Sequence, residues 1–161
     1  QWSGSMFGGM PSYNIGYTGK PVTVVDYFRL LMQLKFPATS AAIVITLLLC
    51  FYFFMLMLGV NPWLSMAGAI AYAFSTYNFV IIEAGHVTKA YALAYMAPMI
   101  GGVILTFRKK LLWGGLFYTI FTAMNIASTH LQITYYAFIL IGIIKPVIFN
   151  VIKISSITEI G

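Results

Sequence analysis

The sequence predicts an all-α integral membrane protein, and three observations carry this prediction. Hydrophobic residues fill 61% of the 161 positions and charged residues only 7%, whereas soluble domains are about half apolar and about a quarter charged. The apolar residues gather in five runs, each near the ~20 residues that a spanning helix needs. The formal net charge of +6 comes from cations that are scattered or that end apolar runs, where they meet anionic lipid head groups. This composition excludes a disordered chain and a nucleic-acid-binding module.

The N-terminal part of the chain is expected to lie outside the membrane core. Residues 1–24 are rich in Gly, Ser, Tyr and Pro without a helical period, which predicts an extracytoplasmic loop. In residues 25–36, the polar residues Asp26, Arg29 and Gln33 recur at helical spacing among apolar neighbours. That pattern predicts a short amphipathic helix in the membrane interface.

Five apolar segments follow, and each is expected to cross the membrane. They cover residues 38–60, 62–82, 90–107, 111–128 and 132–152. The second starts at Asn61-Pro62, since Asn can cap a helix and Pro is tolerated in its first turn. Only "NIASTHLQ" separates the last two, which as one helix would be about 60 Å long, twice the hydrocarbon thickness. We therefore expect a break near Ser128 to His130, with one kinked helix as the alternative.

Threading five spans from residue 38 assigns the connections to two sides. One side carries Asn61-Pro62, Arg108, Lys109, Lys110 and Lys153, and the other carries the N-terminal loop, residues 83–89 and residues 128–132. The three consecutive cations indicate that their side is cytoplasmic.

The expected organisation has three parts. They are an external loop with its interfacial helix over 1–36, a transmembrane bundle over 37–153 and a cytoplasmic linker over 154–161. Because the chain starts at Gln1 without a Met or a basic-then-apolar leader, we expect it to be a piece of a longer polypeptide.

The external side of the predicted bundle holds the candidate site. Glu83, His86 and Lys89 fall within seven positions around Gly85, which we expect to be the hinge of a tight turn. A plain alternative is a polar hairpin wetted by interfacial water, in which Glu83 and Lys89 pair weakly.

The second external break adds further polar side chains. They are Asn125, Ser128, Thr129, His130 and Gln132. Asn125, Thr129, Gln132 and Tyr136 share one helical face if the helix persists through the break. The alternative is hydrogen bonding between helices, at about 1 kcal/mol or less per bond. Together the two breaks predict a pocket at the membrane surface, in which Lys89 and the imidazoles hold a phosphate while Glu83 and the amides bond sugar hydroxyls.

We expect neither a metal nor a cofactor at these residues. Cys50 is the single cysteine and lies inside an apolar run, which is typical of a buried apolar residue. The His and Glu spacing lacks the HExxH form of a zinc site. No nucleophile triad is apparent either.

Three motifs carry a family resemblance. "SMFGGMPSYN", "AGHVTKAYALAYMAP" and "STHLQITYY" occur in that order and resemble the YfhO-like family of bacterial polytopic membrane proteins over nearly the whole chain. That family is similar to the GT-C fold of membrane glycosyltransferases, which take sugars from polyprenyl-phosphate carriers on the outer face. The resemblance implies substrate or carrier contacts at Gly8, Gly9, Pro11, His86, Lys89, His130 and Gln132. The catalytic Asp of GT-C enzymes follows a membrane helix that would precede Gln1, so no catalytic residue is assigned here, Asp26 included.

The expected function is therefore part of a GT-C-like transferase in the bacterial inner membrane. The resemblance implies membrane lipids, a polyprenyl-phosphate-linked sugar donor and a cell-envelope polymer acceptor as partners, and no nucleic acid. One alternative is a transporter or flippase, in which the polar face is one gate of a pathway. It predicts ionisable residues deep within the spans, where Lys145 is the only plain candidate. The other is a non-catalytic membrane scaffold.

Overall fold

The computed structural model describes residues 2–3, 10–11, 24, 27, 28, 31 and 40–158, with the backbone alone for 2–3, 10–11, 145 and 148–158. Two short strands, β1 (Trp2–Ser3) and β2 (Met10–Pro11), pair antiparallel, with Trp2 opposite Pro11. Val24, Tyr27, Phe28 and Leu31 are helical and exposed. The rest of the predicted interfacial helix, like Gly8 and Gly9, lies outside the described residues.

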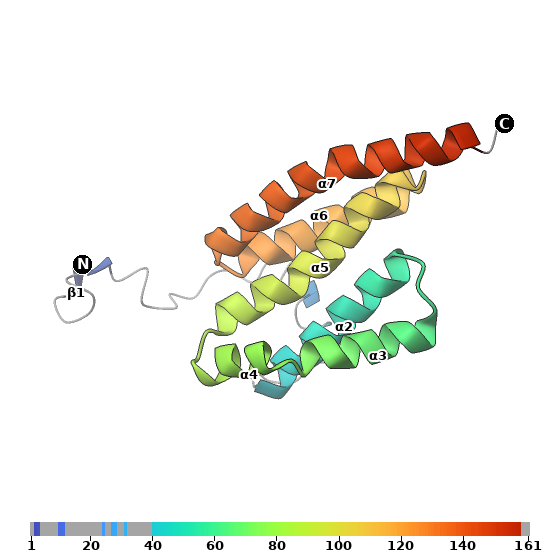
Figure 1. The fold of residues 1–161 in the computed structure, drawn as a ribbon. Helices are drawn as coiled ribbons and strands as arrows, with labels where there is room; N and C mark the ends of the chain where they lie inside the picture. The colour runs from blue at the N-terminus through green and yellow to red at the C-terminus, as the bar shows by residue number, and fades with distance from the viewer. Residues whose placement is uncertain are drawn as a thin grey trace.

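The described residues from 40 onward form a bundle of six helices (Figure 1). They are α2 (Ser40–Met57), α3 (Pro62–Ala73), α4 (Thr76–Glu83), α5 (Val87–Phe107), α6 (Leu111–Ala127) and α7 (Leu131–Thr158). Two of them, α2 and α5, are long and apolar enough to cross a membrane, and α3 with α4 makes a third if this bent pair is one span. In the described part of the chain, α6 and residues 131–144 of α7 are apolar but shorter. The predicted helical class is confirmed, whereas five spans stay a prediction.

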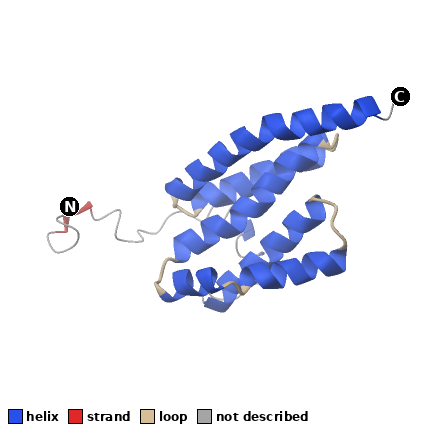
Figure 2. Cartoon of the chain, viewed as in Figure 1, coloured by secondary structure: helices blue, strands red, loops and turns tan. Residues whose placement is uncertain are grey.

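The connections between helices collect at two ends of the bundle. The loops over 58–61 and 108–110 lie at one end, and the turns over 84–86 and 128–130 lie at the other (loops in Figure 2). Arg108 ties the first two together, because its Nη1 donates a hydrogen bond to the Leu58 carbonyl at 2.7 Å. This grouping agrees with the prediction that Asn61-Pro62 and the three cations share a side.

Helix α5 is the centre of the bundle and packs between α2 and α6. Two consecutive glycines make this possible, since they face opposite neighbours. A Cβ on Gly101 would lie 2.8 Å from the Met57 sulfur of α2, and one on Gly102 would lie 2.7 Å from the Tyr118 backbone N of α6. Gly114 returns the contact from α6, where a Cβ would collide with Thr106. Small residues of this kind let helix backbones approach closely inside a membrane.

The segment over 62–82 is not the single helix that the sequence predicts. It breaks at Phe74-Ser75, and α3 and α4 meet at a bend of 43°. The buried Asn78 side chain spans the break, with its Nδ2 donating a hydrogen bond to the Tyr72 carbonyl at 2.7 Å. The Ser75 N–H donates to the same carbonyl at 3.2 Å, so backbone and side chain together satisfy it at the break.

The break expected near Ser128 to His130 is present. Helix α6 ends at Ala127 and α7 begins at Leu131, so one kinked helix over 111–152 does not form. Thr129 adopts a positive φ of 62° in the turn, and its backbone N–H donates to the Ile126 carbonyl at 3.0 Å. A left-handed residue after a helix end reverses the chain direction.

The close approach of α5 and α6 predicts that alanine is tolerated at one of two adjacent glycines and not at the other. Gly114→Ala should destabilise the protein by about 1–3 kcal/mol, because the new Cβ meets backbone atoms of α5. Gly115→Ala is the matched control, since a Cβ there meets nothing within 4 Å. Unfolding titrations in detergent measure both variants. Equal stability of the two would contradict the packing described here.

Candidate functional site

The turn between α4 and α5 is built around Gly85. Gly85 has φ of +74°, its N–H donates to the Ile82 carbonyl, and the His86 N–H donates to the Ile81 carbonyl, both at 3.0 Å. This pair of bonds is the Schellman ending of a helix, which favours glycine at the left-handed position. The predicted hinge is therefore confirmed. It puts Glu83 in the last turn of α4 and His86 immediately before α5.

Lys89 interacts with an aromatic ring of the preceding helix. Its Nζ lies 5.6 Å from the centroid of the Tyr77 ring, within the range of a cation–π contact. Lys89 is half-buried, whereas Glu83 and His86 are exposed. The described residues show no Glu83–Lys89 ion pair, so the partner of the ammonium here is Tyr77. Sequence reasoning missed Tyr77, because nothing in its spacing from Lys89 reveals a contact across a turn.

The first turn of α5 has backbone N–H groups that are open to a ligand. Its N-cap residue, His86, forms no side-chain capping bond. In the part of the chain that the structure describes, the backbone N–H groups of Thr88 and Lys89 have no hydrogen-bond acceptor. These groups carry the positive end of the helix dipole, which favours a bound anion. The helix begins at Val87 rather than at the predicted residue 90, so His86 and Lys89 flank its first turn.

Asn125 lies in the interior and joins three helices. It is fully buried, its Nδ2 donates to the Ala92 carbonyl of α5 at 2.8 Å, and its Oδ1 accepts a hydrogen bond from Thr134 Oγ1 of α7 at 2.7 Å. This is the interhelical bonding that the sequence left open as an alternative. The face predicted to join Asn125 with Thr129 and Gln132 does not form, because the helix ends between them.

His130 and Gln132 stand at the start of α7. His130 is half-buried, and its buried Nδ1 has no hydrogen-bond partner among the described residues. Gln132 is exposed, and its Nε2 donates to the Tyr136 hydroxyl at 2.9 Å. The neighbouring Ser128 is buried, with its Oγ donating to the Asn125 carbonyl at 2.5 Å. Ser128 thus connects the α6–α7 turn to the buried Asn125.

The structure brings most of the predicted site residues to one end of the bundle. Glu83, His86 and Lys89 come from the α4–α5 turn, and His130 and Gln132 from the α6–α7 turn (Figure 1). Pro11 is described only as backbone paired with Trp2. Within the described residues, no group of three His, Cys, Asp or Glu is placed to hold a metal ion.

A groove opens beside Glu83. It has a volume of about 690 Å³ and runs between the start of α2 and α4. Its lining comes from Ser40, Phe79, Val80, Ile82, Glu83 and Ala84. The groove is therefore apolar along α4 and carries a carboxylate at the end next to the α4–α5 turn. This arrangement suits a ligand with a hydrocarbon part and a polar head.

Comparison with protein-family models, curated proteins and solved structures found no match for this chain. Over residues 40–158 the structure defines a helical bundle with two or three helices able to cross a membrane. Among the residues whose side chains are described, the charged ones lie at the two ends of the bundle.

The Asn125 bonds predict an asymmetry between two threonines. Thr134→Val should destabilise the protein by about 1–2 kcal/mol, because it leaves the buried Asn125 oxygen without its donor. Thr119→Val is the control, since this exposed hydroxyl bonds only the Gly115 carbonyl of its own helix. Both are compared with wild type by thermal unfolding in detergent. A Thr119→Val variant as unstable as Thr134→Val would refute the role given to Asn125.

Proposed function

We propose that the chain is part of a polytopic membrane glycosyltransferase-like protein of the bacterial inner membrane. It uses a polyprenyl-phosphate-linked sugar to modify a cell-envelope polymer. The observation that carries the proposal is the junction of two features at the α4–α5 turn. An apolar groove reaches Glu83, and the adjoining start of α5 offers a cation and open backbone donors. The resemblance of three motifs to the YfhO-like family supports the same function.

The start of α5 provides the groups that bind a phosphate. An anion there meets the Lys89 ammonium, the His86 imidazole and the N–H groups of the first helical turn. Hydrogen bonds between a charged donor and a charged acceptor are about twice as strong as neutral ones. The Tyr77 ring fixes the Lys89 side chain over α4, which limits the conformational freedom that binding has to remove.

The groove along α4 provides the complementary apolar surface. Phe79, Val80 and Ile82 line it and suit the isoprenoid part of a carrier lipid. Glu83 stands where the apolar lining ends, and its carboxylate is an acceptor for sugar hydroxyls. His130 and Gln132 lie at the same end of the bundle and serve in this proposal as further contacts to the substrate.

The proposed reaction transfers the sugar from the lipid phosphate to a hydroxyl of the acceptor polymer. A carboxylate base outside the residues assigned here removes the hydroxyl proton, and the oxygen then attacks the anomeric carbon. The bond between that carbon and the phosphate oxygen breaks, so the phosphate gains negative charge. Lys89 and His86 stabilise this charge as it develops, which lowers the barrier.

A transporter or flippase is the second candidate, and the α3–α4 break favours it. Broken helices whose released backbone groups find partners are typical of transporter pathways, and Asn78 supplies such a partner here. Reconstitution into vesicles separates the two functions. Movement of a lipid-linked sugar across the bilayer without transfer to an acceptor would favour the transporter.

The phosphate site predicts a loss of affinity from a single neutral substitution. Lys89→Gln in the full-length protein should weaken binding of polyprenyl phosphate by about 1.5–3 kcal/mol, because one hydrogen bond to a charged group is removed. Isothermal titration in detergent measures this loss. Lys109→Gln, at the opposite end of the bundle, is the control and should bind normally.

An exchange variant sharpens the same test. Glu83→Lys combined with Lys89→Glu retains both charges and should insert and fold, yet lose the lipid phosphate. Full binding by both Lys89→Gln and the exchange variant would exclude a phosphate site at this turn.

The membrane arrangement predicts opposite labelling of the two ends. In a Cys50→Ala background, a cysteine at Thr88 should react with a membrane-impermeant thiol reagent in intact cells. A cysteine at Lys109 should react only after permeabilisation, because the cationic end faces the cytoplasm. The reverse pattern would place the proposed site on the wrong side for an envelope substrate.

A further inference from the structure

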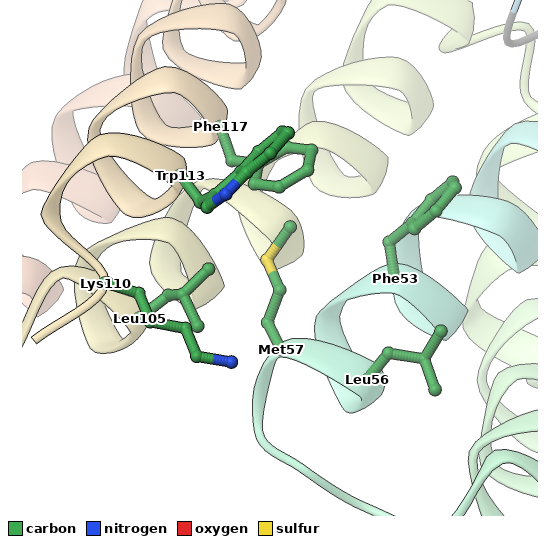
Figure 3. A pocket seen from close by; sticks show the side chains of 7 residues that line it. All are labelled: Phe53, Leu56, Met57, Leu105, Lys110, Trp113 and Phe117. Atoms are coloured by element: carbon green, nitrogen blue, oxygen red, sulfur yellow. The ribbon is translucent and has the colours of Figure 1, made fainter. Parts of the chain in front are cut away.

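A second cavity lies at the cationic end of the bundle, away from the proposed site. It has a volume of about 310 Å³, within the range of small-ligand sites. Its walls include Phe53 and Met57 of α2, Leu105 of α5, and Trp113 and Phe117 of α6, with Lys110 at its edge (Figure 3). The cavity is therefore an open gap between α2 and α6, to whose wall α5 contributes Leu105.

The lining divides into a hydrocarbon part and one cation. The rings of Trp113 and Phe117 lie beside Met57, and Lys110 is the one charged residue of the lining (Figure 3). Trp113 is 58% exposed, and tryptophan at the end of an apolar helix is typical of the lipid head-group level. The site thus matches the two parts of a lipid. Its apolar lining suits an acyl chain, and Lys110 suits a charged head group.

The loop before α6 sets which cation faces the cavity. Arg108 is held away by hydrogen bonds from its Nη1 to the carbonyls of Met57 and Leu58. Lys109 adopts a positive φ of 65° at the turn and does not line the cavity. Lys110 directly precedes α6 and does line it. One lysine therefore has a specific position in the cavity, while its neighbour contributes only charge to the surface.

The surrounding charges select the ligand. Glu83 is the only acidic residue among those the structure describes, and it lies at the opposite end of the bundle. The ammonium of a zwitterionic lipid would thus find no carboxylate near this cavity in the described part of the chain. An anionic head group would meet Lys110 directly and Lys109 nearby. Basic pockets between membrane helices bind anionic lipid head groups in this way.

We propose that this cavity is a binding site for an anionic phospholipid. One acyl chain occupies the gap between α2 and α6, and the phosphate of the head group contacts the Lys110 ammonium. This site is separate from the proposed sugar-carrier site, and its existence does not depend on that function.

Native mass spectrometry of the full chain in detergent tests the proposal with two added lipids, phosphatidylglycerol and phosphatidylcholine. The wild type should retain phosphatidylglycerol preferentially. Lys110→Gln should weaken that retention about tenfold or more, as expected for loss of a hydrogen bond to a charged group. Lys109→Gln removes the same charge one residue away and should stay within about twofold of wild type.

A second variant tests the apolar part. Leu105→Trp fills the cavity without changing any charge and should also reduce phosphatidylglycerol retention. Unfolding midpoints confirm that each variant is folded, and Lys110→Gln alone suffices if Leu105→Trp does not fold. Inorganic phosphate should fail to displace the lipid, because it lacks the acyl chain.

Four results would overturn the proposal. Equal losses in Lys110→Gln and Lys109→Gln would indicate diffuse attraction to a charged surface. Equal retention of the two lipids would show that the site does not select charge. Displacement by inorganic phosphate would indicate a simple anion site. A dimer mass in place of bound lipid would show that a second copy of the chain fills the gap.

Discussion

The buried amide of Asn125 is the constraint on which the arrangement of the polar end depends. Its two hydrogen bonds reach the Ala92 carbonyl of α5 and the Thr134 hydroxyl of α7, while Asn125 itself belongs to α6. In an apolar interior these partners cannot be exchanged for water, so the amide fixes the rotation and depth of three helices at once. The amide therefore holds the end of α6 and the start of α7 against the first half of α5.

Short connections produce the two-ended distribution of charge. The links over 58–61, 84–86, 108–110 and 128–130 have three or four residues each, and such short links make successive helices run antiparallel. Alternate links consequently meet at the same end. One end gathers Arg108, Lys109 and Lys110, and the other gathers the carboxylate, the imidazoles and Lys89. The close contacts at Gly101, Gly102 and Gly114 hold α2, α5 and α6 side by side near the cationic end.

The sequence predicted the helices where turn residues interrupt apolar runs, as at Gly85 and near His130. It failed at Phe74-Ser75, because the polar residues there are Ser75 and Thr76, and such small polar residues also occur inside continuous membrane helices. The two polar breaks predicted which residues gather at the candidate site. They did not predict the hydrogen bonds that those residues form. The Asn125–Thr134 bond crosses a reversal of the chain, so helical spacing cannot predict it. The count of five spans stays a prediction from hydropathy. Helix α6 has 17 residues, fewer than the ~20 that a spanning helix needs.

Electron–electron distance measurement between spin labels tests the central claim, that the Asn125 bonds hold the two polar turns together. Labels on cysteines at the exposed positions Thr88 and Gln132, in a Cys50→Ala background, report the separation of the two turns directly. The account predicts one narrow distance distribution with Asn125 present. In Asn125→Leu, which keeps a side chain of similar size without the amide, the distribution should broaden and move to longer distances. An unchanged narrow distribution in Asn125→Leu would contradict the account.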